Sequence, residues 1–266
     1  MRLFLWLALL PAAGSALAAS SEYECIIEAR TTVEIRSPVE GLIETVAVDR
    51  GDPVKKGQVV VQLESGPERA NLAIARSRAE MTGPVEAAQA RVEFAKTKEK
   101  RQEELARQNF VSASAVDEAR TERRLAESEL KVAIENQKLA QLEVDRAQEQ
   151  LALRTIRSPV DGLVVQRLLK AGEFATSNIK EPILKLAEVN PLYVEVVLPA
   201  SMFGKVRRGD QAEVVPETPA IKATARVLVA DRVIDAASGT FGVRLELPNP
   251  GNQIPAGAKC KARFLK

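Results

Sequence analysis

The residues that most often carry chemistry in proteins are sparse in this 266-residue chain. It has no histidine and two cysteines, Cys25 and Cys260. Zinc sites and Ser-His or Cys-His catalytic pairs need ligands or a base that this set cannot supply. We therefore assign no catalytic residue, no metal and no cofactor. The cysteines leave two alternatives, a disulfide between them or two buried, unpaired thiols.

One short motif occurs twice, as IRSPVEGL over residues 35–42 and as IRSPVDGL over residues 156–163. A tandem array would repeat at least three times at a short fixed period, so two distant copies suggest two halves of one module. In each copy a proline fixes φ, an acidic residue and a glycine turn the chain, and a β-branched run follows. Each copy therefore predicts the start of a β-hairpin.

The segment between the copies, from about Pro67 to Leu153, is rich in Ala, Glu, Lys, Arg, Gln and Leu, which favours helix. Its second arm has two sets of residues at heptad spacing, mostly apolar or small. One set is Val116, Arg123, Leu130, Gln137, Val144 and Leu151, and the other is Ala119, Ala126, Ala133, Ala140 and Ala147. A seam of about five heptads with alanine at one position predicts a facing helix at close range, as in a coiled coil.

The first arm of this segment has matching seam residues spaced in steps of three and four. Its seam residues are Val85, Ala88, Val92, Ala95, Glu99, Gln102 and Ala106. Interruptions at Gly83-Pro84 and near residues 109–114 predict a break and a turn. Each arm of roughly 40 residues would extend about 60 Å at 1.5 Å per residue, so the segment predicts a projecting helical hairpin.

The residues on either side of the hairpin have strand character. Residues 35–64 and, more loosely, 163–187 contain short β-rich runs separated by glycine turns, which together predict a small β-sandwich split by the hairpin. From Pro191 onward, alternating runs spaced by Gly-Asp, Ser-Gly and Asn-Pro-Gly turns predict a small antiparallel β-barrel. Residues 24–35 alternate well enough to supply this barrel with a partner strand.

The N-terminus, MRLFLWLALLPAAGSALAAS, has the features of a secretory signal: one positive charge, an apolar run from Leu3 to Leu10 and a small-residue cleavage site. We expect a signal peptide over residues 1–18, cut after Ala18. A retained membrane anchor is the alternative, but the apolar run is far shorter than the roughly 20 residues that span a bilayer. Export would place Cys25 and Cys260 in an oxidising compartment, where they could form a disulfide.

The charge balance limits the partners. A formal net charge of +2, with 28% charged residues, describes a solvated and nearly neutral protein. No basic block with interleaved aromatic residues is present, so we expect no nucleic-acid partner.

In their order along the chain, three motifs resemble the periplasmic adaptor subunits, or membrane fusion proteins, of the HlyD family in tripartite efflux and export systems. They are the split lipoyl-like halves SPVEGLIETVAVDRGDPVKKGQVVVQLES and SPVDGLVVQRLLKAGEF, the heptad hairpin between them, and VRLELPNPGNQIPAGAKCKARF. The last is similar to the closing strands of the adaptor barrel. The resemblance implies a mainly β fold: a split lipoyl-like β-sandwich with an inserted antiparallel coiled coil, and a small antiparallel β-barrel.

The resemblance also implies domain bounds and partners. We expect the domains as follows: barrel 22–34 and 191–266, lipoyl-like (barrel-sandwich hybrid) domain 35–65 and 154–190, and coiled-coil hairpin 66–153. The family forms rings, usually of six copies, that link an inner-membrane transporter to a TolC-like outer-membrane channel. We favour a transporter of the resistance-nodulation-division type over an ATP-driven one. Members with a membrane-proximal domain continue past the barrel, whereas this sequence ends at Lys266, so no docking surface for the transporter is assigned.

A biotinyl or lipoyl carrier is a competing interpretation of the same resemblance. Such carriers place a modified lysine on a tight turn after a strand that corresponds to VVQLES, but Gly66 and Pro67 follow that run here. Lys55 and Lys56 lie in the preceding turn and are more simply explained as solvated turn residues. An exported coiled-coil spacer is a third possibility, but it would leave the split sandwich and the barrel unexplained. We therefore expect a non-enzymatic adaptor in the periplasm.

The resemblance gives roles to three residues near the hairpin turn. Adaptors of this family contact the outer-membrane channel through an arginine, a leucine four positions later and a serine seven positions after that, a spacing matched by Arg101, Leu105 and Ser112. The plainer alternative is a solvated helix charge, a seam residue and a helix cap. In that alternative either Ser112 or Ser114 caps the helix, and Ser114 with Asp117 would resemble a capping box.

Overall fold

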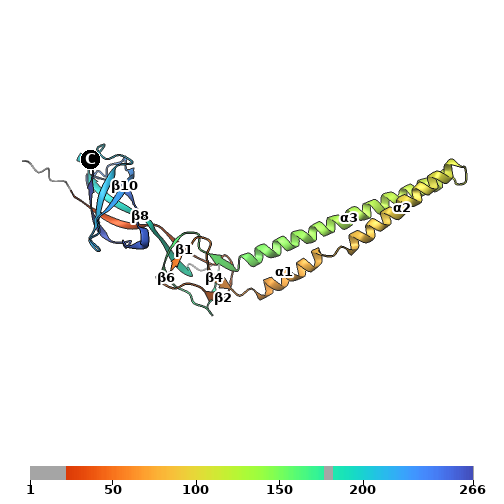
Figure 1. Ribbon diagram of the computed structural model, residues 1–266, viewed down its shortest axis with the longest axis horizontal. Helices are drawn as coiled ribbons and strands as arrows, with labels where there is room; N and C mark the ends of the chain where they lie inside the picture. Colours follow the sequence, from red (N-terminus) through yellow and green to blue (C-terminus); the bar gives the residue numbers. More distant parts are fainter. Residues whose placement is uncertain (1–21, 177–181, 266) are drawn as a thin grey trace, which may run out of the picture. The chain divides into compact units, whose positions relative to one another are not determined.

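The computed structural model describes residues 22–176 and 182–265, and these residues form two compact units (Figure 1). One unit holds the chain up to Val33 and from Leu186 onward, and the other holds Glu34–Lys185. The expected signal peptide, residues 1–18, lies outside the described residues. None of the described helices combines the length and the apolar character that a membrane span requires.

The first unit is a six-stranded β-barrel. Its strands are β1 (Tyr23–Ile35), β8 (Leu184–Pro199), β9 (Gln211–Pro216), β10 (Ala223–Ala230), β11 (Thr240–Leu247) and β12 (Lys259–Phe264). They pair in the order β1-β12-β9-β10-β11-β8, and pairing between β1 and β8 closes the barrel. Two short 3₁₀ turns, Ala200–Met202 and Pro250–Asn252, lie in its connections. The partner strand expected near the N-terminus is therefore confirmed as β1.

Alternation along the strands makes the barrel core. In β11 the residues at every second position are buried, among them Val243, Leu245 and Leu247, and the residues between them face outward. Asn249 closes one end of this core, because its buried side-chain amide donates to the carbonyls of Val189 and Ile254. A buried amide with these partners costs little, since its polar groups are hydrogen-bonded.

The second unit is built from two halves that pair with each other. Its strands are β2 (Gly41–Val46), β3 (Pro53–Val54), β4 (Val59–Leu63), β5 (Thr155–Arg157), β6 (Gly162–Arg167) and β7 (Phe174–Ala175). Strand β2 of the first half pairs antiparallel with β7 of the second, and β3 of the first half pairs antiparallel with β6 of the second. The pairing is reciprocal, so neither half completes its hydrogen bonds without the other.

The repeated motif folds the same way in both halves. The Ser37 hydroxyl donates to the Val39 carbonyl, and the Ser158 hydroxyl donates to the Val160 carbonyl at 2.6 Å. Both serines are buried, and each of these turns leads directly into β2 or β6. The duplicated sequence therefore encodes a duplicated turn, as expected for two halves of one module.

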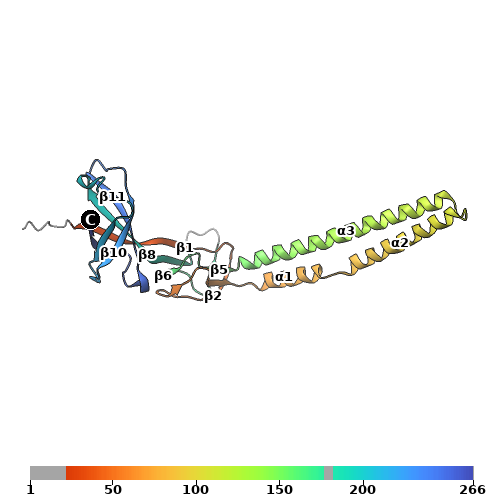
Figure 2. The same ribbon diagram turned by 45° about the horizontal axis from the view of Figure 1, so that its top comes forward.

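The inserted segment forms three helices: α1 (Gly66–Ala79), α2 (Gly83–Arg107) and α3 (Ala113–Ala152). Pro67 and Pro84 occupy the first turns of α1 and α2, where a missing N–H costs nothing. Both views show α3 running beside α1 and then α2 (Figure 2). The 40 residues of α3 span about 60 Å.

The domain bounds shift slightly from those expected. Strand β8 is continuous over Leu184–Pro199, and the chain divides before Leu186 rather than before Pro191. The expectation placed the boundary at Pro191 because the alternating runs spaced by turns were expected to begin there. Here the alternating pattern runs through Pro191, so the strand continues across it.

Cys25 and Cys260 lie directly opposite each other in the β1–β12 pair, with their Cα atoms 4.9 Å apart. Both side chains are buried, and a disulfide joins them in the structure. We expect thiol titration of the exported, denatured and unreduced protein to detect no free thiol. Because the bond would close a loop of 235 residues, replacing both cysteines by serine should lower the free energy of unfolding by about 2–5 kcal/mol. Two reactive thiols in the exported protein would contradict this prediction.

Candidate functional site: the helical hairpin and its turn

The base of the hairpin is fixed to the β-strands of its own unit by Arg154. Its guanidinium donates to the Glu40 carbonyl at 2.8 Å and pairs with the Glu68 carboxylate at 2.6 Å. Its backbone carbonyl accepts from the Leu63 N–H at 2.8 Å. A Cβ at Gly41 would meet this guanidinium, so a larger residue there would displace the Arg154 side chain. Arg154 thus joins the first helical turn of α1, the end of β4 and the first repeat.

The half of the hairpin near its base has an apolar seam. Leu72 and Ala75 of α1 pack against Val144 and Ala147 of α3. Farther along, Val92 and Ala95 of α2 pack against Ala126, with Leu130 at the edge. The heptad pattern of the sequence is therefore confirmed along this part, and small alanine side chains allow the close approach that it predicts.

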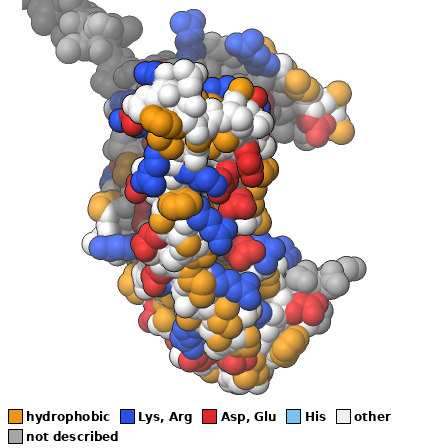
Figure 3. Space-filling model, turned by 90° about the vertical axis from the view of Figure 1, so that its right-hand side faces the viewer, with side chains coloured by type: hydrophobic (Ala, Val, Ile, Leu, Met, Phe, Trp, Pro, Cys, Tyr) orange, Lys and Arg blue, Asp and Glu red, His pale blue; other side chains and the backbone are white. Residues whose placement is uncertain are grey.

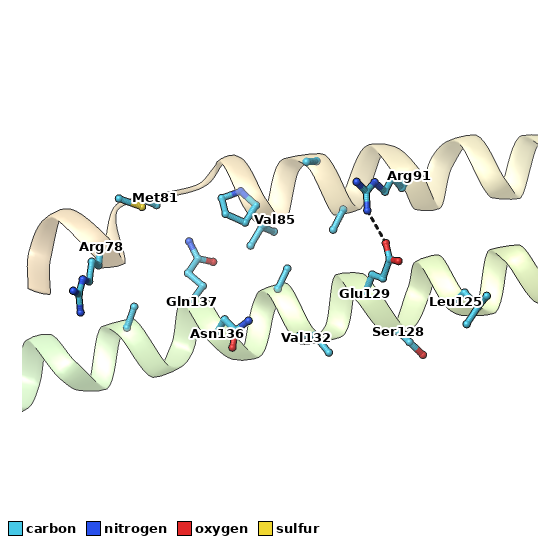
Figure 4. A pocket seen from close by; sticks show the side chains of 15 residues that line it. Arg78, Met81, Val85, Arg91, Leu125, Ser128, Glu129, Val132, Asn136 and Gln137 are labelled. Carbon is cyan, nitrogen blue, oxygen red and sulfur yellow. Dashed lines mark hydrogen bonds and ion pairs between the residues drawn. The ribbon is translucent and has the colours of Figure 1, made fainter.

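The seam is interrupted where α1 ends and α2 begins. Residues 80–82 are not helical, and Ala133, Gln137 and Ala140 on α3 are only half-buried beside this break. A groove of about 770 Å³ lies there. Figure 4 shows Gln137 and Val85 projecting into the space between the helices, and Arg91 joined to Glu129 across it at 2.9 Å. The break at Gly83-Pro84 was predicted from the sequence, and the groove is its consequence.

Toward the turn the seam becomes ionic. Arg123 occupies a seam position and pairs with Glu99 of α2 at 2.5 Å and with Glu127 at 2.7 Å. The hydrogen bond from Arg123 to Glu127, and to a lesser degree the one to Glu99, raises the pKa of the Arg123 guanidinium. Arg120 also reaches Glu99, at 3.4 Å. Charged contacts therefore accompany the buried Ala119 between the arms in this half of the hairpin.

The turn itself is short and held by hydrogen bonds. The Leu105 carbonyl accepts from the N–H groups of Gln108 and Phe110, at 3.2 and 2.9 Å. Asn109 has a positive φ of 60°, a conformation that asparagine tolerates better than most residues. Ser112 caps α3 by accepting from the Ala115 N–H.

The three residues expected at the turn have different environments. Arg101 is exposed on α2 and has no ion pair among the described residues. Leu105 is half-buried on the same face one turn later, and Ser112 is the N-cap of α3. Leu105 and Ser112 flank the turn, whereas Arg101 lies six residues before the end of α2, about 9 Å along its axis. Ser114 lies inside α3 and hydrogen-bonds Ser112 at 2.7 Å, so it is not the cap.

Two features were missed from the sequence. Phe110 is 73% exposed at the turn. On α3, Leu125, Val132 and Leu139 are each more than half exposed and lie seven residues apart. We call these three residues the outer stripe. Their heptad spacing was visible in the sequence, but the helix-facing seam was assigned to the alanines one residue later, and the outer stripe was not considered. Figure 3 looks along the hairpin from its turn and shows hydrophobic side chains among charged ones on its surface.

Comparison with known proteins places this arrangement in a family. Residues 31–187, more than half of the chain, match the family model described as the CzcB-like, barrel-sandwich hybrid domain. The chain belongs to this CzcB-like family. The resemblance to membrane fusion proteins that was inferred from the sequence is confirmed at the level of the family and its fold.

Two curated relatives of the CzcB-like chain are resistance proteins. It is 26% identical over 219 residues to the cobalt-zinc-cadmium resistance protein CzcB of Cupriavidus metallidurans, covering 82% of this chain and 39% of that protein. It is 25% identical over 237 residues to the multidrug resistance protein MdtE of Escherichia coli, covering 84% of this chain and 58% of that protein. The chain therefore spans less than two thirds of the length of these relatives.

Two solved structures share the fold of the CzcB-like chain. MacA from Actinobacillus actinomycetemcomitans has a TM-score of 0.76 at 22% identity, with coverage of 92% of this chain and 78% of that one. The membrane fusion protein Spr0693 from Streptococcus pneumoniae has a TM-score of 0.62 at 17% identity, with coverage of 93% and 99%. At these identities the likeness concerns the fold alone.

The CzcB-like hybrid domain has no lysine where a carrier would need one. After β4 the chain passes through Glu64 and the N-cap Ser65 directly into α1. Lys55 and Lys56 are exposed in the turn between β3 and β4. Their side chains make no ion pair among the described residues, as expected of solvated turn residues.

The ionic seam of the CzcB-like hairpin gives a testable stability prediction. The Glu99 and Arg123 side chains are 13% and 28% exposed, so Glu99→Leu alone would leave Arg123 partly buried with one carboxylate partner fewer. We expect this change to lower the helical melting midpoint, followed by circular dichroism, by on the order of a few degrees. Adding Arg123→Leu should restore or raise the midpoint, because two leucines can pack in the seam.

The matched control is Glu135→Leu, which removes the exposed i,i+4 pair with Lys131 at 3.9 Å. Such surface pairs contribute little, so the midpoint should not move. If Glu99→Leu behaves like Glu135→Leu, the ionic seam does not stabilise the hairpin.

Proposed function

We propose that this chain is an adaptor subunit that links an inner-membrane efflux transporter, of the resistance-nodulation-division type in preference to an ATP-driven one, to a TolC-like outer-membrane channel. The observation that carries the proposal is a two-helix rod, inserted in a CzcB-like hybrid domain, whose only free end is an exposed turn. The resistance functions named for CzcB and MdtE support efflux as the process. The proposal assigns no catalytic residue, since the transporter would supply the energy.

The proposed place of action is the periplasm. The secretory features of residues 1–18 support export, and a partner channel in the outer membrane requires it. A buried cysteine pair held at disulfide distance also suits an oxidising compartment.

We assign channel contact to the turn. A rod about 60 Å long has only its turn free to meet a distant partner. Arg101, which has no ion pair among the described residues, can donate to carbonyls or carboxylates at the end of a partner helix. Leu105 and the exposed Phe110 supply apolar contacts beside it.

We also propose that copies of the chain associate side by side into a ring, with six copies as the family precedent. The outer stripe supports this, because exposed apolar residues at heptad spacing fit another helix. The basic residues beside the stripe, Arg124, Lys131 and Lys138, are also seven apart, and among the described residues none forms an ion pair with α1 or α2. On α2, Glu86 and Glu93 are exposed and likewise form no ion pair in the described part of the chain. Opposite charges on two faces of one hairpin suit a head-to-tail contact, the kind that closes rings.

The channel contact predicts a separation of function. Arg101→Asp reverses an exposed charge, so it should change folding stability by no more than about 0.5 kcal/mol. The variant should accumulate and self-associate normally but fail to restore export in cells that lack the wild-type protein. Leu105→Asp should fail in the same way.

Arg69→Asp is the matched control, since Arg69 is an exposed arginine at the base of the hairpin with no ion pair among the described residues. It should support full export. Full export by both Arg101→Asp and Leu105→Asp would contradict the channel contact and leave these residues as parts of an ordinary coiled-coil end.

The outer stripe predicts self-association. Val132→Asp with Leu139→Asp places charges on an exposed face, so the hairpin should still fold while the particle mass measured by light scattering falls toward that of one chain. Ile74→Asp, at a residue of similar exposure on α1, should leave the mass unchanged. A wild-type protein that is monomeric at all concentrations and does not copurify with any transporter would favour the spacer interpretation instead.

A further inference from the structure

Two loops of the barrel unit meet at one end of the barrel. The first, residues 200–210, joins β8 to β9, and the second, residues 231–239, joins β10 to β11. Their ends are adjacent because Thr240 pairs with Pro199, and the Gly209 N–H donates to the Val227 carbonyl at 2.9 Å. We call these two loops the arginine end.

A hollow of about 440 Å³ lies between the two loops. Arg207, Arg208 and Arg232 line it, and all three are exposed. Its apolar part includes Phe203, whose ring packs edge-on against the buried Phe241 at 5.5 Å. The hollow therefore combines three guanidinium groups with an aromatic side chain that the barrel core holds in place.

The cations of the arginine end are available to a ligand. Among the described residues, the three arginines and Lys205 form no ion pair with a carboxylate. The nearby carboxylates either accept hydrogen bonds from backbone N–H groups or form no ion pair. Asp210 accepts from the Arg207 N–H at 2.8 Å, Asp235 accepts from the Ala237 N–H at 2.8 Å, and Asp231 lies in the hollow without an ion pair. Two of the three carboxylates thus stabilise their own turns rather than neutralise the guanidinium groups.

The second loop also presents apolar side chains to solvent. Val233 is 79% exposed and Ile234 is 38% exposed, next to Arg232. A branched aliphatic side chain that leaves most of its surface in water contributes little to the barrel core. Small apolar side chains beside arginines are suited to the boundary between lipid headgroups and acyl chains.

The N-terminal segment joins the barrel at this same end. The start of β1 lies beside the end of β12, where Tyr23 pairs with Ala262. The end of β12 in turn lies beside the start of β9, where Phe264 pairs with Ala212. The first loop leads directly into β9. Residues 1–21 precede β1 and include the apolar run from Leu3 to Leu10, a segment that enters a membrane during export whether it is then cut or retained. Chain connectivity therefore brings a membrane-directed segment to the arginine end.

We propose that the arginine end docks on a bilayer surface that contains anionic phospholipids. Arg207, Arg208 and Arg232 bind headgroup phosphates at the hollow, while Val233 inserts at the headgroup boundary. A lipid surface suits these residues better than a protein partner does. The exposed apolar side chains of the second loop are few and lie beside cations, whereas a protein interface would bury a continuous apolar centre inside a polar rim.

The test uses the exported full chain and sedimentation with two kinds of vesicle, phosphatidylcholine alone and phosphatidylcholine mixed with phosphatidylglycerol. We expect stronger partitioning onto the anionic vesicles, weakened by added salt. Arg207→Gln with Arg208→Gln should reduce the partitioning onto anionic vesicles at least about tenfold, since each basic residue near such a surface contributes roughly a fivefold factor. Val233→Ser should reduce it on both kinds of vesicle.

The control is Lys55→Gln with Lys56→Gln, the same charge loss at two exposed residues of the hybrid domain. It should retain wild-type partitioning, and because all variants share one N-terminus, residues 1–21 cannot cause a difference between them. Four results would overturn the proposal: equal partitioning of the wild type onto both vesicles, no effect of the arginine changes, an equal loss in the lysine control, or full displacement by inorganic phosphate at the salt concentration used. Loss of a copurifying acidic protein in the arginine variant, with vesicle partitioning intact, would also overturn it and assign the surface to that protein.

Discussion

The structure depends on the reciprocal pairing of two half-modules that the helical hairpin separates in sequence. Strands β2 and β7, and β3 and β6, are too short to be stable alone, so each half needs the other to satisfy its backbone. That requirement brings Leu63 and Arg154 together at the base of the hairpin, where the backbone of one donates to the other. Once these ends meet, the 90 residues between them must leave the β-strands and return to the same place. An antiparallel helix pair satisfies all of its backbone groups internally and buries one stripe, so it is a stable form for such an insertion.

The hairpin changes character along its length, and the change follows from what its base must do. Near the base, apolar contacts such as Leu72 with Val144 hold the arms together without depending on charge. Toward the turn, Glu99 and Arg123 take over, and ionic seams contribute less stability but fix the pairing of specific residues. A firmly closed base transmits the orientation of the β-strands to the arms. A charged distal seam instead fixes the register of the two arms on either side of the turn.

The sequence predicted elements whose pattern is long and regular, and it failed where few residues decide. The heptad seam, the barrel strands and the duplicated motif were predictable because alternation or repetition extends over many residues. Strands β3 and β7 have two residues each, so no periodicity announces their pairing. Ser112 and Ser114 are equivalent by local pattern, and only the start of α3 at Ala113 decides which one caps it. The role of Arg101, by contrast, came from the spacing of a family motif, and the backbone geometry neither requires nor forbids it.

Exposed residues with a regular pattern carry the information about partners that the buried core cannot. The outer stripe keeps a strict seven-residue spacing although nothing in the described chain covers it, and folding alone gives no reason to place Val132 or Leu139 in water. The barrel loops show the same signature in another form, since Val233 gains nothing from the fold at its present position. Residues that cost the isolated chain solubility and return no internal contact are best explained by surfaces that become buried elsewhere. In this chain such residues occur on the flank of the rod, at its turn and at one end of the barrel, which are the places where the proposed adaptor would meet its neighbours.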